Sequence, residues 1–196
     1  MAKSSPVQLG PQFDAAVTQA IAIARGRQFA GVPAIAVAFG ACALALASGA
    51  REDEAVAALA VVPDDDSPDG WYDRRAAYVA AIAALGAGSQ AEAARFASAV
   101  AALAQARALH GALDHDPDAF GLLPAKKFGT LWEWRALVDA YGSERGRHAR
   151  LAADLHEIVT ALAGKPVSAA ELLAAFLIDD TVPEPVKGSL RATVTR

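Results

Sequence analysis

Apolar residues recur along most of the chain every three or four positions, the spacing that is typical of amphipathic helices. This pattern predicts helices over about 11–28, from Pro33 through the apolar run to residue 50, from Glu52 to Pro63, over about 71–85, 91–113, 125–141 and 147–163, and from Ser168 to residue 178. No stretch alternates with a period of two for long enough to predict a strand. The pattern therefore indicates an all-α fold, a compact and irregular helical bundle.

Several of the predicted helices carry the residues that helix ends prefer. Pro33 suits a first turn, and the acidic run that begins at Glu52 suits the positive end of a helix dipole. Ser168 is followed three residues later by Glu171, which is the capping-box pattern. The stretches DDDSPDG and GAGS are expected to be loops because of their composition.

Length and composition define the domain organisation and the class of protein. The chain has 196 residues, enough for one buried core, so we expect a flexible tail over 1–10 and a single helical domain over 11–196. A net charge of −4 without a basic stripe argues against a nucleic-acid partner. The single cysteine, Cys42, excludes an intramolecular disulfide and fits a cytoplasmic protein; it is predicted to be a small core residue.

The uncharged stretch 31–50 is long enough to cross a membrane. About half of it is alanine and glycine, Pro33 and Gly40 interrupt it, and no tryptophan or tyrosine marks an interface. We therefore predict a central helix that other helices surround, and no membrane contact.

Four segments, in order, resemble the motifs of HD-domain phosphohydrolases of the alarmone-hydrolase type. They are GVPAIAVAFGACALALASGAREDEAVAALAVVPDDD, GWYDRRAAYVAAI, ASAVAALAQARAL and KKFGTLWEWRALVDA. The resemblance extends from residue 13 to about residue 163, and the order of the segments and the LW-x-x-R-x-L-V pattern carry most of it. It implies an α-helical, HD-domain-like fold.

The resemblance also implies a divalent metal, held by two histidines and two aspartates, that activates water for attack on a phosphate ester or pyrophosphate. Here the positions that match these ligands carry Val37, Val61, Val62 and Ala101, and a further family histidine matches Ala104. Valine and alanine offer no oxygen or nitrogen to a metal ion. We therefore expect no metal, no cofactor and no catalytic residues.

Other family positions keep their polar character. The basic positions are Lys127, Arg135, Arg74, Arg75 and Arg107, and Asp65 and Asp66 match an acidic pair that acts beside the metal in the family. The resemblance implies that some of the basic groups face phosphates. The alternative is that Trp132 and Trp134 pack in the core, that the basic groups form surface ion pairs, and that the aspartates mark a solvated helix end.

The four histidines allow a second interpretation. His110 and Asp114 are four residues apart on one helical face, with His115 adjacent, which is an acceptable spacing for metal ligands. The other interpretation is a polar helix end. His148 and His156 are predicted to lie on the surface.

Three functional hypotheses follow. The first is a catalytically inactive HD-like domain that acts as a scaffold or regulatory subunit, with a homologous active subunit or a second copy of itself as its protein partner. The second is a module that binds a phosphorylated nucleotide in the old cleft. The third is a hydrolase with a rebuilt metal site around His110.

Overall fold

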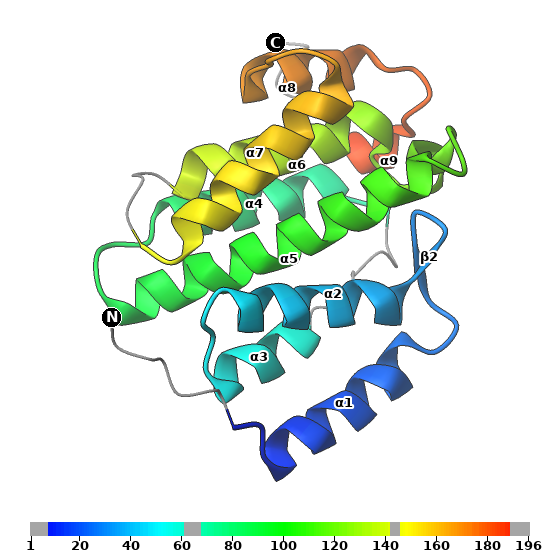
Figure 1. Ribbon diagram of the computed structural model, residues 1–196. Coiled ribbons are helices and arrows are strands. Elements are labelled where there is room, and N and C mark those ends of the chain that lie inside the picture. Colours follow the sequence, from blue (N-terminus) through cyan, green and yellow to red (C-terminus); the bar gives the residue numbers. More distant parts are fainter. Residues whose placement is uncertain (1–7, 61–67, 142–145, 189–196) are drawn as a thin grey trace.

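The computed structural model describes residues 8–60, 68–141 and 146–188, and within them the chain folds mostly into helices (Figure 1). The α-helices are α1 (Pro11–Ala24), α2 (Ala34–Ala47), α3 (Glu52–Leu59), α4 (Trp71–Ala83), α5 (Ser89–Leu113), α6 (Lys126–Tyr141), α7 (His148–Ala163), α8 (Ala169–Ile178) and α9 (Glu184–Lys187). A 3-10 turn, η1 (Ala119–Leu122), precedes α6. The prediction of a helical, compact chain is confirmed.

Most helix boundaries lie within a few residues of the prediction because the signals that set them are local. The α8 helix starts with the predicted capping box, in which the Ser168 side chain accepts the N–H of Glu171 and the Glu171 carboxylate accepts the N–H of Ser168. The α3 helix begins at Glu52 as predicted. The predicted end of that helix at Pro63, with Val61 and Val62 as core residues, lies outside the described residues.

The first helix differs from the prediction in two ways. It ends at Ala24, and Gln28–Phe29 (β1) then pairs antiparallel with Val32–Pro33 (β2). Two-residue strands are too short to give an alternating pattern, so the sequence did not reveal them. Within this helix Ile23 is 44% exposed, whereas Ala20 and Ala24 are buried.

The long helix α5 occupies the centre of the molecule (Figure 1). On one side it packs against α2 and α3, and α1 covers α3. On the other side it packs against α7, which in turn packs against α6. Helices α4 and α8 both pack on α6, so α6 is enclosed by neighbours on several faces.

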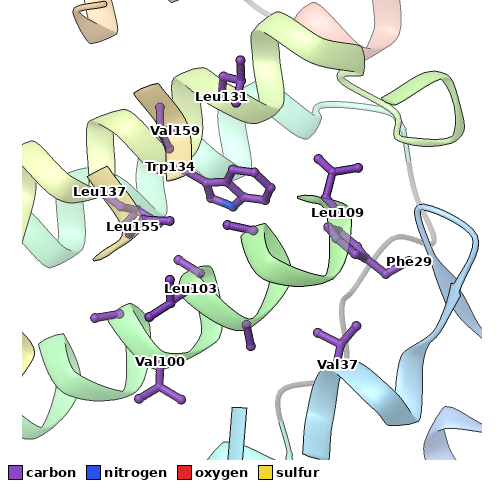
Figure 2. Packing of buried hydrophobic residues seen from close by; sticks show 14 of the residues in the cluster. Phe29, Val37, Val100, Leu103, Leu109, Leu131, Trp134, Leu137, Leu155 and Val159 are labelled. Atoms are coloured by element: carbon purple, nitrogen blue, oxygen red, sulfur yellow. The ribbon is translucent and has the colours of Figure 1, made fainter. Parts of the chain in front are cut away.

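The main core lies where α5, α6 and α7 meet. Figure 2 shows Trp134 of α6 between its own helix and the part of α5 that carries Leu103 and Leu109. Phe29 and Val37 approach the same core from the α2 side (Figure 2). The predicted burial of both tryptophans of α6 is confirmed, since Trp132 is 6% exposed and Trp134 is 1% exposed.

Helix α2 is only partly enclosed. Ala38, Ala41 and Ala45 are completely buried, and Cys42 is in the core as predicted, but Phe39 on the opposite face is 41% exposed. The prediction of a helix surrounded on all sides was therefore too strong, because α1 leaves one face of α2 uncovered. Within residues 8–60, 68–141 and 146–188, no helix combines the length and the apolar character needed to cross a membrane.

Candidate functional site

A cavity lies between α4, α5 and α6, and its lining includes Ala101, one of the positions that match a family metal ligand. Its main chamber is about 380 Å³, and a smaller chamber of about 30 Å³ adjoins it. Arg75, Gln105, Glu133 and Trp134 line both chambers. We call these two chambers together the α4–α6 cleft.

An ion pair lies at the junction of the two chambers. Nη1 of Arg75 is 3.4 Å from Oε1 of Glu133, and the two side chains are 28% and 9% exposed. Helix α4 presents the guanidinium and helix α6 presents the carboxylate. Burial raises the pKa of Glu133, and the charge of Arg75 offsets part of that rise. The carboxylate therefore depends on Arg75 for its charge compensation.

A second set of polar groups connects the three helices beside the cleft. The Tyr78 hydroxyl donates to Oγ of Ser98 at 2.9 Å, and Ser98 is hydrogen-bonded to the hydroxyl of Tyr141 at 3.0 Å. Burial raises the pKa of both tyrosines. The hydroxyls therefore stay neutral and act as hydrogen-bonding groups that fix α4 and α6 to α5.

The rest of the main chamber is apolar, lined mostly by alanine and by Ile82 and Leu137. Apolar walls with a few converging polar groups are typical of small-molecule binding sites. The lining includes no histidine and no cysteine. It therefore lacks the pair of a hydroxyl or thiol and a histidine base that nucleophilic catalysis commonly uses. The described walls of this cleft therefore offer a few polar groups within an apolar lining.

The residues at the expected metal-ligand positions have apolar surroundings. Val37 is 1% exposed and belongs to the main core together with Ala104, which is 4% exposed. Ala101 is half-buried and lines the main chamber of the α4–α6 cleft. The other two positions, Val61 and Val62, lie outside the described residues, as do Asp65 and Asp66.

The predicted basic residues each have their own neighbours. Arg135 contacts Nδ1 of His156 and pairs with Asp139 at 2.9 Å, and it therefore lies on the side of α6 that faces α7. Lys127 lies over the ring of Phe120, with Nζ 5.9 Å from the ring centroid.

Arg74 and Arg107 have different neighbours again, and Arg75 lies in the α4–α6 cleft. Arg74 donates to the carbonyl oxygen of Asp69 at the start of α4. Arg107 pairs with Asp154 of α7 at 3.1 Å. Ligand binding by Lys127, Arg135, Arg74 and Arg107 stays a prediction.

The rebuilt metal site is not formed in the described residues. Within residues 8–60, 68–141 and 146–188, no three His, Cys, Asp or Glu side chains are close enough to hold a metal ion together. This includes His110, Asp114 and His115. His156 is exposed as predicted.

The prediction that His148 lies on the surface was wrong. Its side chain is 4% exposed, with Nδ1 2.9 Å from Oε2 of Glu92 and its ring 6.0 Å from the ring of Tyr141. The charged residues around it in the sequence suggested exposure, but the first turn of α7 packs on α5 and covers the imidazole.

Sequence reasoning missed Glu133 as a site residue. One signal could have revealed it, since the carboxylate stands between two tryptophans in the apolar segment TLWEWRALV. A charged residue in such a segment is buried only when a partner compensates its charge. That partner, Arg75, had already been noted for a different reason.

Comparison with known proteins adds no relative. No model of a known protein family matches the chain, and no curated protein matches it either. The function is therefore argued from the residues and their geometry.

Proposed function

We propose that this protein is a catalytically inactive HD-like domain that acts as a regulatory or scaffolding subunit, by binding rather than by catalysis. One observation carries the proposal: residues that would have to be metal ligands are apolar and packed. Val37 is 1% exposed, and Ala101 forms part of the wall of the α4–α6 cleft. Neither side chain has a donor atom for a divalent ion, and HD chemistry needs that ion to activate water.

Exposed apolar side chains support a protein partner. Ile21 on α1 is 46% exposed and Phe39 on α2 is 41% exposed. Exposed apolar side chains mark a partner-binding surface when they form a contiguous patch. If the partner is a second copy of the chain, light scattering should show a dimer that Ile21→Asp or Phe39→Asp weakens. If both variants have the same mass as the wild-type dimer, Ile21 and Phe39 do not lie in the contact between the two copies.

The α4–α6 cleft supports a second candidate function, the binding of a small ligand. Arg75, Glu133 and Gln105 can together offer donors and acceptors to one molecule inside apolar walls. Glu133 repels a phosphate group, so the cleft suits a neutral ligand better than the phosphorylated nucleotide proposed from the sequence. A thermal-shift screen of nucleosides and amides against wild type and Gln105→Ala would test this candidate.

Restoring the missing ligands tests the HD-like part of the proposal. The variant carries Val37→His, Val61→His, Val62→Asp and Ala101→Asp, which puts a family ligand at each matching position. If the fold is HD-like, the four side chains converge, and we expect stoichiometric binding of Mn²⁺ with an increase in melting temperature. The wild type, in parallel, should not hydrolyse pyrophosphate-bearing nucleotides in the presence of Mn²⁺.

The matched control is the triple variant without Ala101→Asp. It introduces the same buried polar groups except one, so it is destabilised to a similar degree but lacks one metal ligand. Equal Mn²⁺ affinity in the triple and quadruple variants would contradict the HD-like arrangement. So would a quadruple variant that remains unfolded when it is refolded in the presence of Mn²⁺, as judged by circular dichroism.

A further inference from the structure

A second cavity lies between the C-terminal end of α2, the middle of α5 and the first turns of α7. Its volume is about 440 Å³, and three arginines line it: Arg107 of α5, Arg147 just before α7, and Arg150 in the first turn of α7. Asp154 is the acidic residue in the lining, and Leu44 and Leu151 contribute apolar surface. We call it the arginine cavity.

The three guanidinium groups are engaged to different degrees. Arg147 is fixed, because it donates two hydrogen bonds to the Glu54 carboxylate at 2.8 and 2.5 Å and lies 4.7 Å from the ring centroid of Phe96. Arg107 pairs with Asp154 at 3.1 Å and keeps 48% of its side chain exposed. Arg150 is exposed and has no hydrogen bond or ion pair with any described residue.

The local charge is positive although the chain as a whole is acidic. The lining holds three arginines and one aspartate, and Glu54 behind Arg147 neutralises one more positive charge. This leaves the guanidinium of Arg150 uncompensated in a protein with a net charge of −4. An anion that enters the cavity is therefore attracted to a defined place rather than to a basic surface in general.

We propose that the arginine cavity binds the phosphate monoester group of a small molecule. Guanidinium groups bind phosphate oxygens in pairs of parallel hydrogen bonds, which favours phosphate over a point-like anion.

The apolar part of the lining determines what the phosphate is attached to. Leu44, Ala47 and Leu151 can contact an organic group, and a volume of about 440 Å³ is in the range of known small-molecule sites. The ligand class is thus a phosphate monoester with an organic part of roughly nucleoside size. Arg150 binds the phosphate directly, Arg107 shares it with Asp154, and Arg147 holds the wall in place.

Titration calorimetry of the full chain tests this site. The probes are AMP, inorganic phosphate and adenosine, against wild type, Arg150→Gln and Arg107→Gln. We expect AMP to bind more tightly than inorganic phosphate and adenosine not to bind. Loss of one charged hydrogen-bonding partner should weaken AMP binding roughly 10- to 100-fold in Arg150→Gln, and less in Arg107→Gln. Arg147 is left unchanged because it also holds α3 through Glu54.

The control variant is Arg25→Gln, which removes an equally exposed arginine that lies at the end of α1 and outside this cavity. It should leave AMP binding unchanged, and binding to wild type should weaken as salt rises. Three outcomes would overturn the proposal: no binding of AMP or phosphate, equal binding to wild type and Arg150→Gln, or an equal loss in Arg25→Gln. None of these outcomes bears on the metal-ligand variants, so this site stands or falls separately from the HD-like assignment.

Discussion

The α4–α6 cleft and the arginine cavity use charge in opposite ways. In the cleft, one carboxylate and one guanidinium face each other in largely apolar surroundings, and Glu133 is 7% exposed. In the arginine cavity the cations outnumber the anions, and Arg107 keeps about half of its side chain in contact with water. Both cavities are lined by α5, so the same helix separates two different electrostatic environments.

The difference shows how solvent exposure decides what a charged residue is available to do. In a buried ion pair each charge is compensated by its partner, because removal of one partner leaves the other charge in a low-dielectric environment. Arg75 and Glu133 therefore compensate each other's charge. Exposed arginines contribute little to stability through surface ion pairs. Their donors are available to a ligand, which is why we place phosphate binding in the arginine cavity.

The largest expected effect concerns the wall of the cleft. Trp134→Ala should lower the free energy of unfolding by about 3–5 kcal/mol, because the indole is 1% exposed and contacts the core around Leu109. The control is Phe128→Ala on the same helix, which is 36% exposed and should cost less than about 1 kcal/mol. Urea unfolding measures the free energy of unfolding of both variants. Similar losses in the two would contradict the burial of Trp134 in the wall of the cleft.

The next largest effect concerns the ion pair of Arg75 and Glu133. Arg75→Gln should lower stability by roughly 1–3 kcal/mol at neutral pH, since it leaves Glu133 without its cation. Burial raises the pKa of Glu133, so its contribution is most favourable below its ordinary pKa of 4.5 and is lost as the pH rises through the folded-state pKa. The loss in Arg75→Gln should therefore increase as the pH rises above the ordinary pKa of 4.5.

The double variant Arg75→Gln/Glu133→Gln is the control for that experiment. It contains no titrating carboxyl at this place, so the additional pH dependence should disappear. A pH profile for Arg75→Gln that runs parallel to that of the double variant would show that Glu133 does not depend on Arg75.

A smaller effect is expected at the edge of the arginine cavity. The hydrogen bonds from Arg147 lower the pKa of Glu54, so this carboxyl stabilises the fold above its ordinary pKa of 4.5 and loses that contribution as the pH falls through the lower folded-state value. Glu54→Gln should reduce stability by about 1–2 kcal/mol at neutral pH, with the difference from wild type vanishing in acid. Thermal unfolding at several pH values would show a constant difference if this explanation were wrong.

The smallest effect on stability is the most informative about function. Arg150→Gln should change the free energy of unfolding by less than about 0.5 kcal/mol, because the side chain is exposed and has no described partner to lose. The same variant should nevertheless bind AMP roughly 10- to 100-fold more weakly. A clear loss of stability would instead show that Arg150 contributes to the packing of α7. The α4–α6 cleft would then be the better candidate for a ligand site.

The sequence predicted the helices well and the sites poorly. The capping box at Ser168 and the acidic start of α3 were recognisable because both depend on residues within one helical turn. The burial of Trp132 and Trp134 followed from their place in an apolar segment. The ligand-binding role of Lys127, Arg135, Arg74 and Arg107 stays a prediction, because it combines residues from several helices on the basis of motif positions alone.

Some features of the fold come from contacts that no local pattern contains. An alanine at Gly129 would place its Cβ 2.7 Å from the ring of Phe176, so α6 and α8 approach each other closely at that glycine. His148 has charged neighbours in the sequence and is buried all the same, because α7 turns that side toward α5. These contacts depend on the rotation and crossing of helices.

The sequence by itself determined the helical class of this protein, the positions of most helix ends and the apolar character of the expected metal-ligand positions. These properties depend on side-chain chemistry and on spacings of three or four residues. Only the tertiary structure decided that Glu133 meets Arg75, and that Arg107 meets Arg147 and Arg150 across about forty residues of chain. The physical reason is that helical periodicity defines which residues share a face, whereas the packing of whole helices defines which faces enclose a common space.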